Sequence, residues 1–210
     1  MYRKMFIAVL IILAVPLQAQ TQISGSQSGT LGPGTYLVVG DISVESGDSL
    51  TILPGTVFLH TGNYKWLVSG KFSAIGTEAD SILFLRQEPI NNDRWGGLHF
   101  INGAPIAAID YCVIDNCFLD FSMEYFASIN IYNGGQGLYL KHSRVTNANM
   151  TYYGGGVYAK DASVLIDSCL ISDNFQNNSA RGAGIYLVGC NGAQIIHSLI
   201  GYNACDLDGS

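Results

Sequence analysis

Apolar residues alternate with other residues in the first third of the chain, which is typical of short β-strands. The alternating pairs are Ile42 with Val44, Leu50 with Ile52, and Val57 with Leu59, and Gly47 and Pro54-Gly55 separate them. The same phrase recurs about thirty residues later, where Gly70, Phe72 and Ala74 match Gly40, Ile42 and Val44. We therefore expect a chain built from repeated short strands and turns.

The second half of the chain follows one template: apolar, any, apolar, two more residues, a small Cys or Ser, any, apolar. Four copies fit this template: Ala107, Ile109, Cys112, Ile114; Leu138, Leu140, Ser143, Val145; Val164, Ile166, Cys169, Ile171; and Ala193, Ile195, Ser198, Ile200. A further alternating pair precedes each copy: Leu98 with Phe100, Ile129 with Ile131, Val157 with Ala159, and Ile185 with Leu187. The three-residue step inside the template breaks the alternation, so a bend there turns the small residue inward.

Repeats of this length, made of short strands, cannot bury their apolar faces alone and must stack on their neighbours. Polar pairs suited to left-handed turns close the repeats, namely Asp115-Asn116, Thr146-Asn147, Asp173-Asn174 and Tyr202-Asn203. The pattern predicts an all-β fold, a right-handed parallel β-helix (solenoid). About six coils fit between Thr35 and Asn203, which corresponds to a length of about 29 Å at roughly 4.8 Å per stacked strand.

The chain begins with the three parts of a secretory signal: Arg3 and Lys4, an apolar run up to Leu17, and Ala19 before a polar stretch. We expect residues 1–19 to be a signal peptide, residues 20–34 an N-terminal leader or cap, and residues 35–210 an incomplete β-helix. The apolar run is shorter than the roughly 20 residues of a spanning helix, so no transmembrane segment is expected after cleavage. The expected location is secreted or cell surface.

The last coil ends just past a turn and would leave an open sheet edge, a site of unwanted pairing. This favours a β-helix truncated at its C-terminus, with cell-surface anchoring through a missing C-terminal tail.

Loss of Arg3 and Lys4 would leave eight basic residues against sixteen acidic ones. An acidic surface argues against nucleic acid as a partner, and against polyanionic glycans unless calcium bridges the two. The five cysteines are odd in number and lack a CxxC pair, so we expect no metal site and predict buried thiols that fill space.

Several phrases resemble bacterial secreted right-handed β-helix proteins of the pectate-lyase-like superfamily: residues 49–58, 70–76, 95–100 and 166–171. The resemblance covers nearly the whole chain after residue 19. It implies the fold more strongly than a function, because this superfamily includes lyases, glycosidases and adhesins. The Asn-Thr-Asp, Asp-Asp and Gly-His-Gly motifs of its polygalacturonase-like branch are absent from the sequence.

Asp110, Lys141 and Asp167 occupy one outward column on successive coils in the aligned frame. Two carboxylates could flank a cation, with calcium as the possible cofactor and Lys141 as the base. The alternative is an exposed salt-bridge ladder, which we favour because it cancels repulsion between stacked strands. His142 and His197 share the next position, at the bend, and are expected to fill it.

A second outward column contains His99, Asn130, Tyr158 and Tyr186, and Tyr152 and Tyr153 lie on a neighbouring loop. Exposed aromatic rings supply flat apolar faces with polar tips, on which sugar rings stack. The alternative is an aromatic stack that stabilises the sheet. The loop from Phe118 to Phe126 either forms a working face or covers the sheet.

These patterns lead to two functional hypotheses. The first is a non-catalytic extracellular or cell-surface module, adhesin-like or glycan-binding, whose partner is an extracellular polysaccharide. The candidate ligand-binding residues are His99, Tyr152, Tyr153, Tyr158 and Tyr186. The alternative is a polysaccharide lyase or glycoside hydrolase that uses Asp110, Lys141 and Asp167.

Overall fold

The computed structural model describes residues 20–87, 95–119, 127–132, 134–150, 154–176 and 182–205. The expected signal peptide, Tyr152, Tyr153 and most of the loop from Phe118 to Phe126 lie outside the described residues. Every regular element within these ranges is a β-strand, as the alternation predicts.

The strands follow one another at short intervals. They are β1 (Thr21–Ser26), β2 (Gly29–Leu31), β3 (Gly34–Val44), β4 (Ser49–Ile52), β5 (Thr56–His60), β6 (Trp66–Val68), β7 (Lys71–Ile75), β8 (Ile82–Arg86), β9 (Leu98–Phe100), β10 (Ala107–Asp110), β11 (Cys112–Asp115), β12 (Phe118–Leu119), β13 (Ile129–Ile131), β14 (Gly137–Lys141), β15 (Arg144–Thr146), β16 (Asn149–Met150), β17 (Val157–Lys160), β18 (Ser163–Asp167), β19 (Leu170–Ser172), β20 (Phe175–Gln176), β21 (Ile185–Val188), β22 (Gln194–Ile196), β23 (Leu199–Gly201) and β24 (Ala204–Cys205).

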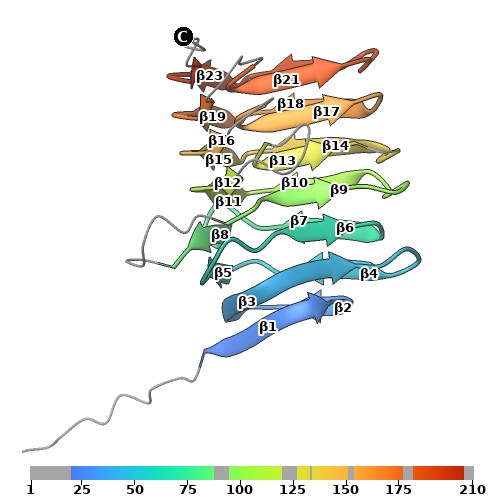
Figure 1. The fold of residues 1–210 in the computed structure, drawn as a ribbon, viewed down its shortest axis with the longest axis vertical. Helices are drawn as coiled ribbons and strands as arrows, with labels where there is room; N and C mark the ends of the chain where they lie inside the picture. The colour runs from blue at the N-terminus through green and yellow to red at the C-terminus, as the bar shows by residue number, and fades with distance from the viewer. Residues whose placement is uncertain are drawn as a thin grey trace, which may run out of the picture.

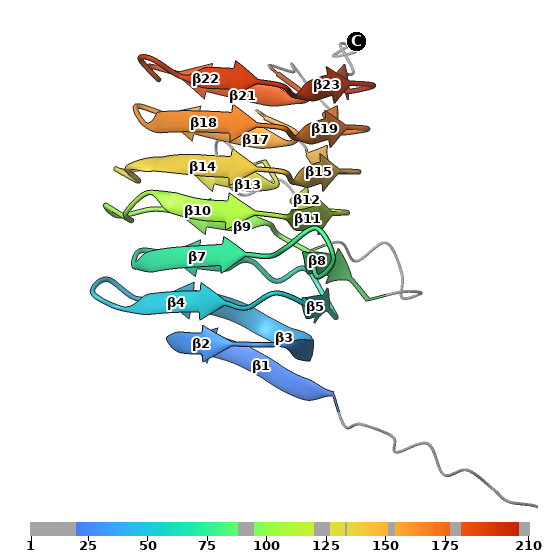
Figure 2. The same cartoon turned by 180° about the vertical axis from the view of Figure 1, so that it is seen from behind.

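These strands form parallel sheets in which each strand pairs with its counterparts in the neighbouring repeats. One sheet has 13 strands, a second has the order β2-β4-β7-β10-β14-β18-β22, and a short third has the order β12-β16-β20-β24. The long strand β3 connects two faces of the first sheet, because its first half pairs with β5 and its second half with β6. The sheets rise together from β1 to β23, consistent with a parallel β-solenoid, and we call this arrangement the stack (Figures 1 and 2).

The four-copy template is confirmed residue by residue in the pairing register. Ile109 pairs with Leu140, Leu140 with Ile166, and Ile166 with Ile195. The first three copies bury every template residue, with exposed fractions of at most 5%. The upstream pairs are in register too, for example Leu98 with Ile129 and Val157.

In four successive repeats, two of the bends contain a non-glycine residue with positive φ. The first bend has φ between 41° and 55° at the aligned residues Tyr111, His142, Ser168 and His197. The second has φ between 56° and 58° at Asn116, Asn147, Asp173 and Tyr202. Asn and Asp tolerate this region better than most residues do, so the expected polar turns are confirmed.

Side-chain oxygens at the bends bond to the backbone of the preceding repeat. Ser143 Oγ accepts from the Cys112 amide, and Ser198 Oγ accepts from the Cys169 amide, both at 3.0 Å. Asn203 Oδ1 accepts from the Asn174 amide at 3.1 Å, while its amide group donates to the Ile171 carbonyl. The repeats are therefore locked in register by polar contacts as well as by apolar packing.

The cysteines are all free, and Cys112, Cys117 and Cys169 are buried in the core as expected. Cys190 is half-buried and Cys205 is exposed, so the prediction of a buried thiol is wrong for Cys205. Burial raises the pKa of the Cys169 thiol to about 11, with hydrogen bonds from the backbone opposing the shift. The prediction of inward-facing residues is wrong for one alternating pair. Val57 and Leu59 of β5 are only half-buried, whereas Thr56, Phe58 and His60 point inward. The reason is an aromatic cluster in this part of the core, where Phe58 packs on Phe84 at 5.1 Å between ring centres.

Residues 20–34, expected as a leader or cap, contribute the first strands of the stack. β1 pairs with β3 and β2 pairs with β4, both in parallel. Four of the six β1 residues are polar, and all except Ile23 are exposed.

Candidate functional site

The aromatic column is in the predicted register, but most of it is not exposed. His99 pairs with Asn130, Asn130 with Tyr158, and Tyr158 with Tyr186. His99, Asn130 and Tyr158 have exposed fractions of 0%, 0% and 1%, and Tyr186 is half-buried. The expectation of an open aromatic face is wrong for His99 and Tyr158, and nothing described bears on Tyr152 and Tyr153.

Local contacts of the side chains in this column explain why they are not exposed. His99 Nε2–H donates to the Gly96 carbonyl at 2.7 Å, and the Asn130 side chain bonds to the backbone of Ala127. The rings of Tyr158 and Tyr186 lie 5.7 Å apart. Burial lowers the pKa of His99 to about 4, so His99 is neutral at ordinary pH. These residues behave as a stabilising layer on the sheet.

The acidic column also has the predicted register, with Lys141 paired between Asp110 and Asp167. The expected salt-bridge ladder through Lys141 is wrong: in the described part of the chain Lys141 forms no ion pair within 4.0 Å. Each carboxylate instead contacts a histidine of the following repeat. His142 Nδ1 lies 2.9 Å from Asp110 Oδ1, and His197 Nδ1 lies 3.0 Å from Asp167 Oδ1.

Of the two carboxylates, Asp167 accepts more side-chain hydrogen bonds from the described residues around it. Hydrogen bonds from His197 and then from Ser168 lower its pKa, although partial desolvation opposes them. The His197 side chain is 76% exposed, so water reaches the whole pair. The bend therefore presents two Asp–His pairs on an open surface.

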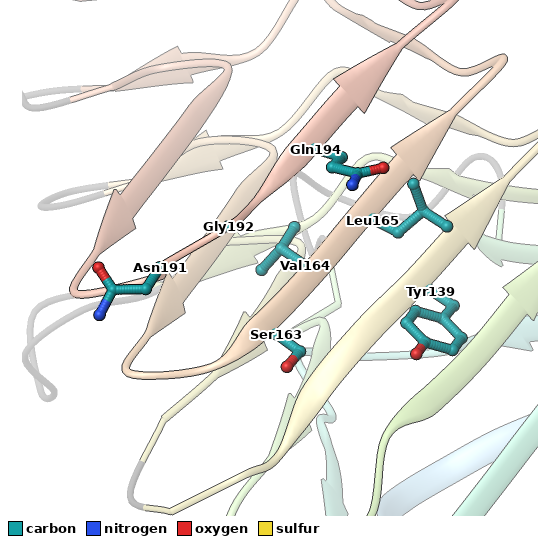
Figure 3. A pocket seen from close by; sticks show the side chains of 7 residues that line it. All are labelled: Tyr139, Ser163, Val164, Leu165, Asn191, Gly192 and Gln194. Carbon is teal, nitrogen blue, oxygen red and sulfur yellow. The ribbon is translucent and has the colours of Figure 1, made fainter.

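A shallow hollow lies on the outer face of the seven-stranded sheet, near its last strand. It has a volume of about 230 Å³ and is lined by Tyr139, Ser163, Val164, Leu165, Asn191, Gly192 and Gln194. Figure 3 shows Tyr139, Leu165 and Gln194 on the neighbouring strands β14, β18 and β22, with Asn191 and Gly192 in the turn before β22.

The template explains how Tyr139 comes to face outward. Its neighbours Leu138 and Leu140 occupy inward positions and are fully buried, and successive side chains of a strand point to opposite faces. Tyr139 is 44% exposed and pairs in register with Leu165, which in turn pairs with Gln194. An aromatic ring and an amide therefore lie two strands apart on one face.

The chemistry of the hollow suits hydroxyl-rich ligands. Its lining has no charged side chain, and Ser163, Asn191 and Gln194 offer hydroxyl and amide groups. These three are exposed, and their side chains make no hydrogen bond within the described ranges. A Tyr ring supplies an apolar face for a sugar ring, and free amides can bond to its hydroxyls.

Sequence reasoning missed this hollow although a signal was present. Tyr139 is the one aromatic residue at the unspecified second position of the template, where the other copies have Ala108, Leu165 and Gln194. The turn residues Asn191 and Gly192 gave no such signal, because their approach to β18 depends on the stacking of two repeats.

The described residues contain no group of three or more His, Cys, Asp or Glu side chains placed to hold a metal ion. They also contain no helix that is long and apolar enough to cross a membrane. Comparisons with protein-family models, with curated proteins and with solved structures found no match for this chain.

Proposed function

We propose that this chain is a non-catalytic glycan-binding module, exported by residues 1–19 and displayed outside the cell or on its surface. In this proposal the stack is a right-handed parallel β-helix of about six coils, of the pectate-lyase-like type. The single observation that carries the binding function is the hollow around the exposed ring of Tyr139.

The lining chemistry favours a neutral glycan. No cationic side chain lines the hollow, and the whole chain has a formal net charge of −6. An anionic sugar would therefore gain no counter-charge at the hollow and would approach a surface of like sign. A neutral sugar ring stacked on Tyr139, with hydroxyls bonded to Asn191 and Gln194, meets neither problem.

The form of the hollow supports binding without turnover. At about 230 Å³ it is smaller than the roughly 300–1,000 Å³ clefts that enclose small ligands. Its lining offers no carboxylate pair, while glycoside hydrolysis commonly uses two carboxylates that flank the bond. Tyr139 and its neighbours can hold a sugar but have no acid or base to cleave it.

A polysaccharide lyase or hydrolase is the second candidate, and the Asp–His pairs favour it. Asp167 holds His197 through Nδ1, which leaves Nε2 as a base oriented toward solvent. Lys141 lies between the two carboxylates in register. We rank this candidate second because the pairs are open to water, which weakens every electrostatic interaction that catalysis would use.

The experiment is a polysaccharide panel measured for retention and for product. Neutral and acidic polysaccharides are tested by affinity electrophoresis, with and without calcium, and each reaction is assayed for unsaturated product and reducing ends. We expect retention on a neutral polysaccharide, no calcium dependence and no product. Product that disappears in Asp167→Ala would replace this proposal with the second candidate.

A further inference from the structure

Uncharged side chains extend away from Tyr139 across the outer face of the seven-stranded sheet. The pairing register places five residues in one line across successive strands: Thr51, Ser73, Ala108, Tyr139 and Leu165. We name these five residues the outer row. Their strands β4, β7, β10, β14 and β18 lie one above another on one side of the stack (Figure 2).

The outer row points away from the core. Both strand neighbours of each member are buried, and successive side chains of a strand point to opposite faces. Each of the five strands is paired on both sides, so the row lies within the stack and not at one of its ends. The row also continues in register at Thr30 on β2 and at Gln194 on β22. A ligand on the row therefore meets no closed end among the described residues.

The row offers hydroxyl groups without charge. Thr51 and Ser73 are half-buried, and within the described ranges their hydroxyls make no hydrogen bond. On β7 the short side chain of Ser73 lies between Lys71 and Ile75, two longer residues that are both exposed. The small side chains of Ser73 and Ala108 therefore leave room for a ligand above the sheet, and the free hydroxyls can bond to it.

We propose that the glycan is an extended linear chain whose internal units lie along the outer row, across the strands and parallel to the axis of the stack. This inference rests on the proposed glycan-binding function. One unit stacks on Tyr139, and the following units bond to Ser73 and Thr51. The five strands of the row span about 19 Å, and one sugar unit of an extended chain covers a length close to one strand spacing, so about five units cover the row.

The other direction, along β14, fits a neutral chain less well. The next outward side chain on β14 is Lys141, which lies in register between Asp110 and Asp167. A neutral chain laid there would remove water from charged groups without supplying a counter-charge. β14 also has only five residues, whereas the sheet has seven strands, so the longer uncharged path is across the strands.

The test is calorimetric titration with oligosaccharides of the retained neutral polysaccharide, from a disaccharide to chains longer than the row. We expect the affinity of the wild type to rise about tenfold with chain length, through the added hydrogen bonds, and to level off at about five units. Ser73→Arg places a long side chain in the row, two strands from Tyr139. This variant should bind the disaccharide as the wild type does but lose the rise.

Ile75→Arg is the matched control, because Ile75 is the next outward residue of β7 and lies outside the row. It should keep the whole rise, and circular dichroism checks that both Arg variants are folded. Ser73→Ala, which removes one hydroxyl without adding bulk, should lower the affinity for long chains a few-fold and leave that for the disaccharide unchanged.

Affinity that does not depend on chain length, or a rise that persists in Ser73→Arg, would overturn the row as the path of the chain. An equal loss in Ile75→Arg would do so too, because it would place the chain outside the row. Failure of the proposed function looks different: neither short nor long chains would bind, or Tyr139→Ala would leave every affinity unchanged. Either of these results would overturn both proposals.

Discussion

At the scale of a single residue, the buried His60 makes the stability of the fold depend on pH. Trp66 Nε1–H donates to His60 Nε2 at 2.9 Å, so the proton of His60 is on Nδ1 and is donated to the Leu85 carbonyl at 2.8 Å. The ring stacks on Trp95 with 4.1 Å between ring centres. Burial lowers the pKa of His60 to about 3, and the hydrogen bond that the ring donates to the Leu85 carbonyl opposes this shift.

We expect acid to destabilise the protein through His60. The unfolded chain takes up a proton near pH 6.5 and the folded chain only near pH 3, so the free energy of unfolding falls as pH drops between these values. The loss is up to about 1.4 kcal/mol per pH unit. His60→Gln keeps an acceptor for Trp66 and a donor for Leu85 but does not titrate.

Urea unfolding at pH 7 and pH 5 measures this effect. The wild type should lose more stability than His60→Gln, while His99, present in both, contributes equally to each. Equal losses in the two proteins would show that His60 does not titrate in this way.

At the bend, His197 controls the ionisation of Asp167. Its hydrogen bond is the largest cause that lowers the pKa of this carboxyl, so His197→Ala should raise the Asp167 pKa toward its ordinary value. Because the folded-state pKa is lowered, the stability from this pair is present above the unfolded pKa and is lost as pH falls through the folded one. Carboxyl ¹³C titration by NMR measures the change. Lys141→Gln is the control, and a shift as large as that of His197→Ala would refute the assigned cause.

At the scale of the strand and the bend, glycines set how closely the repeats approach. A Cβ on Gly155 would lie 2.0 Å from the Ala183 carbonyl oxygen of the next repeat. Gly155→Ala should therefore push two repeats apart and cost about 1–3 kcal/mol, as overpacking does.

Thermal unfolding tests this expectation, since each lost kcal/mol lowers the Tm of a domain of this size by roughly 2–4 °C. Gly201→Ala is the matched control, because the nearest atom to its Cβ would be 4.0 Å away. A similar Tm for both variants would mean that the repeats are not held at this distance.

The elements themselves could largely be predicted from the sequence, because periodicity records which side of a strand is inward. The three-residue step placed Cys169 inward, and the bend at Ser168 has the required positive φ of 55°. The signal failed in β5, where Val57 and Leu59 look like core residues but the cluster around Phe58 takes the inward side.

The sites could be predicted only in part, because contacts between repeats depend on details beyond register. Alignment placed Lys141 between two carboxylates, but the bend at His142, with φ of 41°, brings its ring to Asp110 instead. Whether an outward residue is exposed depends on what packs over it, so Tyr158 is buried while Tyr139 is open. The hydrophobic periodicity of the sequence places both tyrosines outward, so it does not predict which of them is exposed.

At the scale of the whole molecule, a regular stack presents an open hollow beside its buried aromatic layer. The hollow lies on the outer face of the seven-stranded sheet, around Tyr139, and no charged side chain lines it.

The measurement that tests the central claim most directly compares the dissociation constants of the wild type, Tyr139→Ala and Tyr186→Ala for the retained neutral polysaccharide. Loss of one stacking ring is worth about 0.5–1.5 kcal/mol, so Tyr139→Ala should weaken binding by up to about tenfold. Tyr186→Ala removes the half-buried ring at the end of the aromatic column, and this variant should bind as the wild type does. Unchanged binding in Tyr139→Ala, or a loss confined to Tyr186→Ala, would contradict a glycan site at the hollow.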